Sequence, residues 1–427
     1  MSYLCRSLIL VVLLCLFTPP SYAQEQDYNK KTTQEIFNQS KNAIYQIRVI
    51  SKKSGQKKSI GSGFRVFPQG LFVTNYHVIS NAVTDPEDYR LEFRTIDDAE
   101  GELVIRNIDV INDLAVLELA EETPLQNASY LNFSERILNH GEVIFSMGNP
   151  HDLGTTIIDG VYNGLLEDTV YQKILFSGAL NSGMSGGPAF DEHGNVIGVN
   201  VSTGGDDLSY LVPAKFVQSL LKEPKASDQW STVIRDQLIK NSEHIVEMIS
   251  SNEWQTKSFG DFNIPENLHP AVKCWGSGYS ESDTDNRSFA KFVCDMDDYV
   301  YISSDLYTGN IIFSATKIDS HIMNPFAFSE YYELQYDDIN SDVPDKDIDD
   351  VSEFQCKSDF VLIADSHWKT AICSRSYNEY DDVFDVYVKA ALMGREKEGY
   401  VLEVFMDGFS QTSSHKFLQT FLEGVSQ

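Results

Sequence analysis

The chain has 427 residues, of which 42% are hydrophobic and 12% aromatic, and its formal net charge is −30. This composition excludes disorder over most of the length and supplies enough apolar side chains for two or three packed cores. So large a surplus of acidic groups also excludes nucleic acid and anionic membranes as expected partners.

The first residues have the pattern of a secretory signal. Arg6 precedes an apolar run over residues 8–17, and small residues then lead to an expected cleavage after Ala23. Because this run is too short to span a bilayer and no later stretch approaches about 20 apolar residues, we expect no membrane anchor after signal cleavage. Residues 1–23 are therefore predicted to be a signal peptide, and the protein to be exported, either periplasmic or secreted.

Short β-type runs broken by Gly, Asn and Pro extend over residues 42–217, which is typical of all-β barrels. Residues 33–42 predict a leading helix and residues 213–221 a closing one. We therefore assign residues 24–223 to an all-β domain.

The remainder of the chain has a different character. Residues 224–257 are predicted to form a helical linker, because apolar residues recur at near-helical spacing after Asp228, the expected N-cap. Residues 258–427 contain aromatic and β-branched runs, which predict a strand-rich α+β C-terminal domain. Each half of this domain has a cysteine pair and an Asp-Asp before a tyrosine-containing strand, which raises the hypothesis of two similar subunits.

Charge and cysteine content divide the chain at the same place. Residues 24–223 carry 16 basic and 27 acidic side chains and no cysteine, whereas residues 224–427 carry 16 and 36. Of the six cysteines, Cys5 and Cys15 leave with the predicted signal peptide, and the remaining four are an even number in a chain predicted to be exported, which favours two disulfides. Three pairings are possible, and the similar spacings favour Cys274 with Cys294 and Cys356 with Cys373.

Two parts of the sequence can be compared with known metal-site patterns, namely the four cysteines and the acidic run over residues 337–350. No CxxC pair or neighbouring histidine gives zinc-ligand spacing, so zinc is the minor alternative to the disulfides. The acidic run over residues 337–350 offers oxygen ligands for calcium, which is the alternative there, but it lacks the sixth-position glycine and twelfth-position glutamate of an EF-hand loop. We predict a solvated acidic loop there, and no metal or cofactor for the protein.

The segment over residues 181–190 is the most informative part of the sequence. A serine among small residues, Ser185, can expose its hydroxyl and aim its own N–H, with that of Gly183, at one point. This geometry suits the oxyanion that forms when an acyl carbon is attacked. Ser185 is thus a candidate nucleophile, and Gly183 and Ser185 are the candidate oxyanion hole.

A serine hydroxyl needs a base to act as a nucleophile. His77 is predicted at the end of an apolar strand, and Asp113 at the start of another. The order His, Asp, Ser is that of the chymotrypsin type of triad. His77, Asp113 and Ser185 are therefore the predicted catalytic residues, with Asp109, four residues before Asp113, as a rival carboxylate.

Seven collinear segments within residues 33–222 resemble the HtrA or Deg branch of the trypsin-like serine proteases. They are Gly61–Phe64, Gly70–Val78, Asp113–Leu117, Gly148–Pro150, Gly154 with Gly160, Gly183–Pro188 and Gly194–Gly198. The resemblance implies a chymotrypsin-like double β-barrel with the active site between the barrels, and a serine endopeptidase activity on protein or peptide substrates. It also implies that His77 is general base and acid, that Asp113 orients it, and that residues 24–223 are the protease domain.

The chain departs from that pattern in two places. Met184 precedes the nucleophile where trypsin-like relatives have Asp and HtrA-like ones Asn, so activation by zymogen clipping is not expected. No glycine-rich carboxylate-binding motif of a PDZ domain stands out after residue 222. The resemblance also makes Ala179 and Asn181 candidate substrate-pocket residues, and a small or medium apolar P1 side chain the expected preference.

Parts of the sequence are also compatible with other functions. Residues 183–187 also fit the G-x-S-x-G elbow of α/β-hydrolases, but a strand rather than a helix is expected after them, and the histidine lies upstream of the serine. A catalytically silent protease-like scaffold that binds or chaperones is the first alternative. The second is an adhesion or recognition role in which the C-terminal domain binds an unknown ligand.

Overall fold

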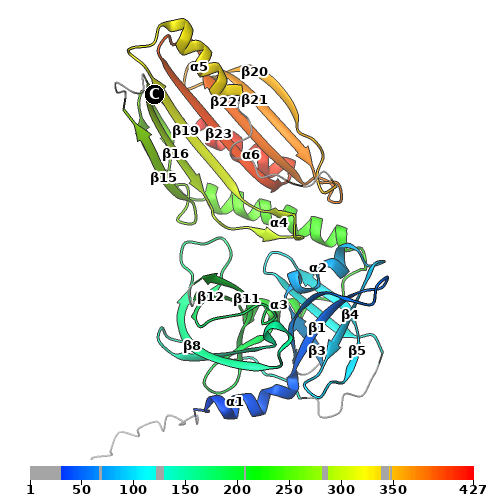
Figure 1. Ribbon diagram of the computed structural model, residues 1–427. Helices are drawn as coiled ribbons and strands as arrows, with labels where there is room; N and C mark the ends of the chain where they lie inside the picture. The colour runs from blue at the N-terminus through cyan, green and yellow to red at the C-terminus, as the bar shows by residue number, and fades with distance from the viewer. Residues whose placement is uncertain are drawn as a thin grey trace, which may run out of the picture.

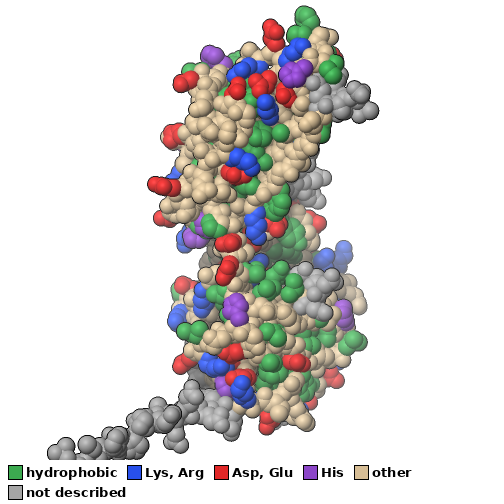
Figure 2. Space-filling model, turned by 90° about the vertical axis from the view of Figure 1, so that its left-hand side faces the viewer, with side chains coloured by type: hydrophobic (Ala, Val, Ile, Leu, Met, Phe, Trp, Pro, Cys, Tyr) green, Lys and Arg blue, Asp and Glu red, His purple; other side chains and the backbone are tan. Residues whose placement is uncertain are grey.

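The computed structural model describes residues 30–66, 70–121, 129–205, 208–280, 287–337, 346 and 349–427. It has two lobes, of which one contains two β-barrels and the other an open sheet, and a long helix lies between them (Figure 1). Figure 2 shows the same two lobes from the side, with acidic side chains on both. The predicted signal peptide and most of the acidic run over residues 337–350 lie outside the described residues.

Twelve strands close into two six-stranded barrels, which confirms the double-barrel fold predicted for residues 24–223. The first has the order β1-β2-β3-β6-β5-β4 and the second the order β10-β11-β12-β9-β8-β7. Closure leaves no strand edge to be covered. The strands are β1 Ile44–Ser51, β2 Lys57–Val66, β3 Leu71–Thr74, β4 Tyr89–Arg94, β5 Glu100–Asp109, β6 Leu114–Leu119, β7 Val143–Gly148, β8 Thr156–Leu165, β9 Ile174–Ser177, β10 Pro188–Phe190, β11 Val196–Gly205 and β12 Leu208–Pro213.

Helices flank the barrels where the sequence predicts them. α1 (Thr33–Ser40) begins at a capping box of Thr32 and Glu35 and is followed by a 3₁₀ turn, η1 (Lys41–Ala43), while α3 (Ala214–Leu220) follows β12. α4 (Trp230–Ser250) lies within the predicted linker. Its N-cap is Gln229 and not the predicted Asp228, because the helix begins with buried Trp230 at the start of its apolar stripe.

One helix of the barrel domain was not predicted. α2 (Tyr76–Thr84) begins where the sequence predicts the end of a strand, so that His77 lies in the first turn of a helix. The residues of α2 that face the barrel are fully or almost fully buried, namely Tyr76, Ile79, Ala82 and Val83. In so short an apolar run, periodicity alone does not distinguish a strand from a buried helix.

The C-terminal domain is one seven-stranded antiparallel sheet of order β15-β16-β19-β23-β22-β21-β20. α5 packs on one face and α6 on the other: Tyr336 of α5 clusters with Ala391, and Phe417 of α6 clusters with Ala390. The elements are β15 Lys273–Tyr279, β16 Ser288–Asp295, β19 Ile311–Asp319, α5 Pro325–Asp337, β20 Gln355–Ile363, β21 Ser366–Ser376, β22 Phe384–Leu392, β23 Glu398–Phe409 and α6 Gln411–Glu423.

Each disulfide joins two directly paired residues on neighbouring strands. Cys274 bonds Cys294 across β15 and β16, and Cys356 bonds Cys373 across β20 and β21, which is the pairing that the spacings favour. In each half a disulfide-linked hairpin is followed by Asp-Asp, further strands and a helix. Both halves contribute to a single sheet, and their internal similarity stays a hypothesis.

Two short hairpins lie outside the large sheet: β13 (Thr256–Phe259) with β14 (Phe262–Pro265), and β17 (Val300–Tyr301) with β18 (Tyr307–Thr308). The second hairpin packs on the first barrel. Its apolar residues share one buried cluster with α2 and α4, whose members include Val78, Ile79, Ala82, Val83, Trp230, Ile234, Val300, Ile302 and Leu306. The two lobes are therefore joined through a common core.

The sheet domain buries a cluster of charges. Lys346 forms ion pairs with Asp385 and Asp407 and donates to the Tyr377 hydroxyl at 2.6 Å, and Arg375 Nε lies 2.7 Å from Asp385. Burial, followed by the neighbouring Asp385, raises the pKa of Asp407 to about 7. Burial also opposes ionisation of Asp385, but the charges of Lys346 and Arg375 outweigh it and hold its pKa below the usual value.

We predict that Lys346→Met lowers the free energy of unfolding by about 3–5 kcal/mol, because a buried carboxylate pair then loses a cation. The loss should be larger at pH 8 than at pH 5. A raised carboxyl pKa contributes stability below the unfolded value, and that stability is lost as pH rises through about 7. Denaturant unfolding of the intact protein at both pH values measures this loss.

The matched control is Lys257→Met. Lys257 is half exposed and pairs with Glu266 at 2.9 Å, and removal of such a surface pair costs about 0–1 kcal/mol. An equal loss in the two variants would contradict the role given to the buried cluster.

Candidate active site

His77 and Asp113 meet through two hydrogen bonds. The carboxylate of Asp113 accepts from the His77 backbone N–H at 2.9 Å and lies 2.7 Å from the imidazole Nδ1. The Asn75 side chain donates to the Asp113 carbonyl at 2.8 Å. With the Nδ1 proton directed at a carboxylate, the other ring nitrogen, Nε2, is left as a proton acceptor.

The turn before β6 sets the position of this carboxylate. Asp113 has a left-handed backbone with φ 53°, which Asp tolerates better than most side chains. The rival carboxylate, Asp109, accepts hydrogen bonds from the Asn112 backbone at 3.0 Å and from its side chain at 2.7 Å. Asp109 therefore closes the turn, and Asp113 is the carboxylate beside His77.

Two opposing effects set the pKa of His77. Burial disfavours the imidazolium and lowers the pKa, whereas the charge of Asp113 and its hydrogen bond raise it, and together they prevail. The pKa of His77 therefore lies above its usual 6.5. Its side chain keeps 29% of its surface exposed, so the ring remains accessible.

The loop that carries Ser185 is held by both barrels. Ser62 of β2 donates its N–H to the Ser185 carbonyl and its hydroxyl to the Gly183 carbonyl, each at 2.7 Å. Gly186 donates to the carbonyl of Asn200 in β11 at 2.9 Å. The loop thus lies at the junction of the two barrels.

Glycine is required at two points of this loop. Gly183 and Gly186 have φ 93° and 84°, a region that other residues rarely adopt. A Cβ on Gly186 would lie 2.1 Å from the Ser62 carbonyl oxygen, and one on Gly183 would lie 2.5 Å from the Asn149 carbonyl oxygen. The spacing of glycines around Ser185 follows from this close approach of backbones.

The Ser185 hydroxyl is directed to β11. It donates to the Val201 carbonyl at 2.8 Å. Within the described residues, no hydrogen bond joins the Ser185 hydroxyl to His77. The structure thus brings His77 and Asp113 together. It places Ser185 at the barrel junction, where the hydroxyl donates its hydrogen bond to β11. Catalytic hydrogen bonds are often incomplete before substrate binds.

The other predicted site residues lie in or beside the same loop. Ala179 and Asn181 are exposed, and the Asn181 amide lies 3.4 Å from the Ala179 carbonyl. Met184 is fully buried in the core of the second barrel, where it packs with Ile144, Phe176 and Leu211. An apolar side chain such as that of Met184 suits these neighbours, because a carboxylate buried among them would need a compensating partner.

Sequence reasoning missed three residues that contact the site. Ser62 lies inside the Gly61–Phe64 segment, so the sequence already marked its neighbourhood as part of a family motif. The Asn200 amide fixes the carbonyls of Met147 and Met184 at 3.0 and 3.2 Å, and nothing in the sequence marks it. Tyr301 reaches His77 from the C-terminal domain, and only the folded arrangement reveals it.

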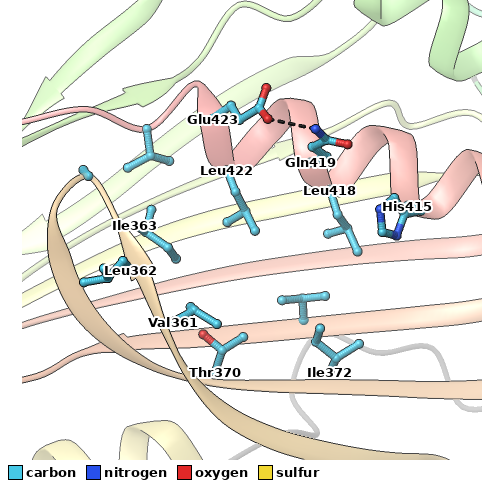
Figure 3. Close-up of a pocket in the computed structure, with 13 residues that line it drawn as sticks. Val361, Leu362, Ile363, Thr370, Ile372, His415, Leu418, Gln419, Leu422 and Glu423 are labelled. Atoms are coloured by element: carbon cyan, nitrogen blue, oxygen red, sulfur yellow. Dashed lines mark hydrogen bonds between the residues drawn. The ribbon is translucent and has the colours of Figure 1, made fainter.

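The C-terminal domain contains a cavity of about 540 Å³ between α6 and the strands β20 to β22. Leu418 and Leu422 point from α6 toward Val361 and Ile372 of the sheet, and Gln419 donates to Glu423 at the rim (Figure 3). This cavity includes none of the predicted catalytic residues, and a ligand of the domain stays a prediction. None of the helices in the described ranges has the length and hydropathy that a bilayer crossing requires.

Comparison with known proteins gives matches to peptidases and proteases. Residues 61–199 match the family model described as a trypsin-like peptidase domain. Protease Do-like 5, chloroplastic, of Arabidopsis thaliana is 35% identical over 36% of this chain and 51% of its own length. A probable periplasmic serine endoprotease DegP-like of Bartonella henselae is 30% identical over 50% of this chain and 44% of its own.

The serine protease HTRA2, mitochondrial, of Bos taurus is 27% identical over 52% of this chain and 48% of its own. The solved serine endoprotease of Yersinia pestis aligns with a TM-score of 0.39 at 19% identity, over 45% of this chain and 66% of that chain. The chain spans about half the length of the curated relatives it matches. Residues 61–199 thus match a trypsin-like peptidase domain, and the N-terminal part of the chain is similar to proteins named as HtrA and DegP-like serine proteases.

Proposed function

We propose that the protein is an exported serine endopeptidase that hydrolyses peptide bonds through Ser185, His77 and Asp113. The observation that carries the proposal is the hydrogen-bonded pair of His77 and Asp113 beside a glycine-fixed serine, at the junction of two barrels. Relatives named as serine endoproteases support the reaction class, and those named as periplasmic support export. The division at residues 24–223, 224–257 and 258–427 belongs to the same proposal.

The geometry gives each residue a step. When the Ser185 hydroxyl turns from the Val201 carbonyl to His77, Nε2 takes its proton and the oxygen attacks the scissile carbonyl carbon. The oxyanion accepts hydrogen bonds from the N–H groups of Gly183 and Ser185. His77 then protonates the leaving amine, and water hydrolyses the acyl-enzyme by the same proton route. Asp113 stabilises the imidazolium throughout.

We predict that Ser185→Ala and His77→Ala each abolish labelling by a fluorophosphonate probe and lower casein cleavage by at least about 10⁴-fold. Ser231→Ala and His244→Ala, which change exposed residues of α4, should leave both readouts unchanged. A wild-type protein that is folded but neither labelled nor active would favour the silent-scaffold alternative.

The raised pKa of His77 predicts the pH dependence. A protonated imidazole accepts no proton, so kcat/KM should fall as pH drops through a midpoint above 6.5. Asp113→Asn removes the charge that raises the pKa, so the midpoint should move down while kcat falls by about 10⁴-fold. Rate profiles from pH 5 to 9 measure both effects. Asp109→Asn is the control, and an identical shift in that variant would argue against Asp113 as the orienting carboxylate.

The proposed substrate pocket includes Ala179 and Asn181, both of which are exposed. Ala179 should favour small or medium apolar P1 side chains, and Ala179→Asp should raise the kcat/KM ratio of Lys or Arg over Val substrates by at least about tenfold. Ala179→Asn has nearly the same shape without the charge and should not do so. Cleavage of a peptide library by the wild type, Ala179→Asp and Ala179→Asn measures this preference. An unchanged kcat/KM ratio in Ala179→Asp would show that Ala179 does not line the pocket.

A further inference from the structure

A hairpin of the C-terminal domain lies directly beside the catalytic histidine. The Tyr301 ring is centred 6.0 Å from the His77 imidazole at an interplanar angle of 76°, and its hydroxyl lies 3.3 Å from the Ser80 hydroxyl. Ser80 is one turn along α2 from His77. Tyr301 thus contacts the helix on which the histidine is carried as well as the imidazole itself.

We propose that Tyr301 is a positioning residue of the active site, so that the C-terminal domain completes the catalytic centre. This inference rests on the proposed function of His77 as the general base. Tyr301 holds the imidazole in the orientation that Asp113 sets and covers part of the ring from water.

The backbone of the hairpin is also bonded to α2. Fully buried Tyr76, the residue before His77, donates its hydroxyl to the Ile302 carbonyl at 2.9 Å. Ile302 follows Tyr301 directly. His77 therefore sits between two anchor points on one hairpin, a hydrogen bond at Tyr76 and a polar contact at Ser80.

The segment before the hairpin contacts the second barrel. Asp298 accepts a hydrogen bond from the Val170 backbone at 2.8 Å, and Asn241 of α4 donates to the Tyr171 hydroxyl at 2.8 Å. The C-terminal domain thus touches both barrels, one on each side of the junction that holds Ser185. Such a bridge fixes where Tyr301 can lie.

The far side of the hairpin is tied to the sheet domain. Thr308 donates its hydroxyl to the Asp407 carbonyl at 3.0 Å and accepts from Tyr377 at 3.0 Å, while Gly309 donates to the same carbonyl at 2.7 Å. These groups belong to the buried cluster that contains Lys346. The hairpin is therefore held at both ends rather than resting on α2 as a loose loop.

The experiment uses the intact protein with Tyr301→Ala, Tyr301→Phe and, as control, Tyr299→Ala, which changes a 41% exposed tyrosine next to the hairpin. We expect Tyr301→Ala to lower kcat and the rate of fluorophosphonate labelling by about tenfold or more, with a smaller change in KM. Phe keeps the ring and should restore most of the rate. Unchanged kcat and labelling in Tyr301→Ala would overturn the proposal.

A second readout does not depend on activity. In a Ser185→Ala background, the imidazole resonances of His77, assigned against His77→Ala, can be titrated by NMR with and without Tyr301. The ionisable groups that face the ring are Asp113 and the phenol of Tyr301, whose own pKa is raised chiefly by burial. Loss of the ring should hydrate the imidazole and move its titration midpoint upward.

The two readouts separate the possible failures. An inactive, unlabelled wild type with a Tyr301-dependent His77 titration would reject the peptidase proposal and keep the contact. An active wild type whose His77 titration ignores Tyr301 would reject the positioning role alone.

Discussion

The paired hydrogen bonds between Asp113 and His77 are the constraint on which the site depends. They are a consequence of sheet register: β3 pairs with β6 so that Thr74 lies opposite Ala115. The chain leaving β3 and the chain entering β6 are therefore neighbours, and Asp113 meets the first turn of α2. One carboxylate fixes both the start of the helix and the orientation of the ring, so a one-residue slip in this pair of strands would remove the site.

The second constraint is the set of hydrogen bonds by which Ser62 holds the loop that carries Ser185. The buried hydroxyl of Ser62 accepts from the Asn149 backbone at 2.9 Å while it donates to Gly183, so one side chain links β2, the end of β7 and the loop. The hydrogen bond to Gly183 fixes the peptide unit between Gly183 and Met184, which directly follows the unit whose N–H is the candidate oxyanion donor. Ser185 itself is less constrained, since its hydroxyl bonds to a strand carbonyl and can rotate.

The sequence predicted the features whose information is local. Glycines that permit close backbone contact, the strands around His77 and Asp113, and the paired spacing of the cysteines are all visible without the fold. The helical state of residues 76–84 was not, because its buried face is created by packing on the barrel and on the hairpin. Tyr301 and Asn200 were missed for a similar reason: their partners lie far away in sequence, and no local pattern marks a contact of that kind.

The shared core changes how the C-terminal domain must be regarded. An adhesion module that the protease merely carried would meet it through a small, polar interface. Here α2 buries Val78, Ile79 and Val83 in one cluster with Trp230 and Ile302 of the C-terminal half. Removal of residues 224–427 would uncover this apolar face on the helix that holds His77. A loss of activity would then report damage to α2 as much as loss of a recognition site. Point substitutions at the contact are therefore the sharper way to separate the roles of the two domains.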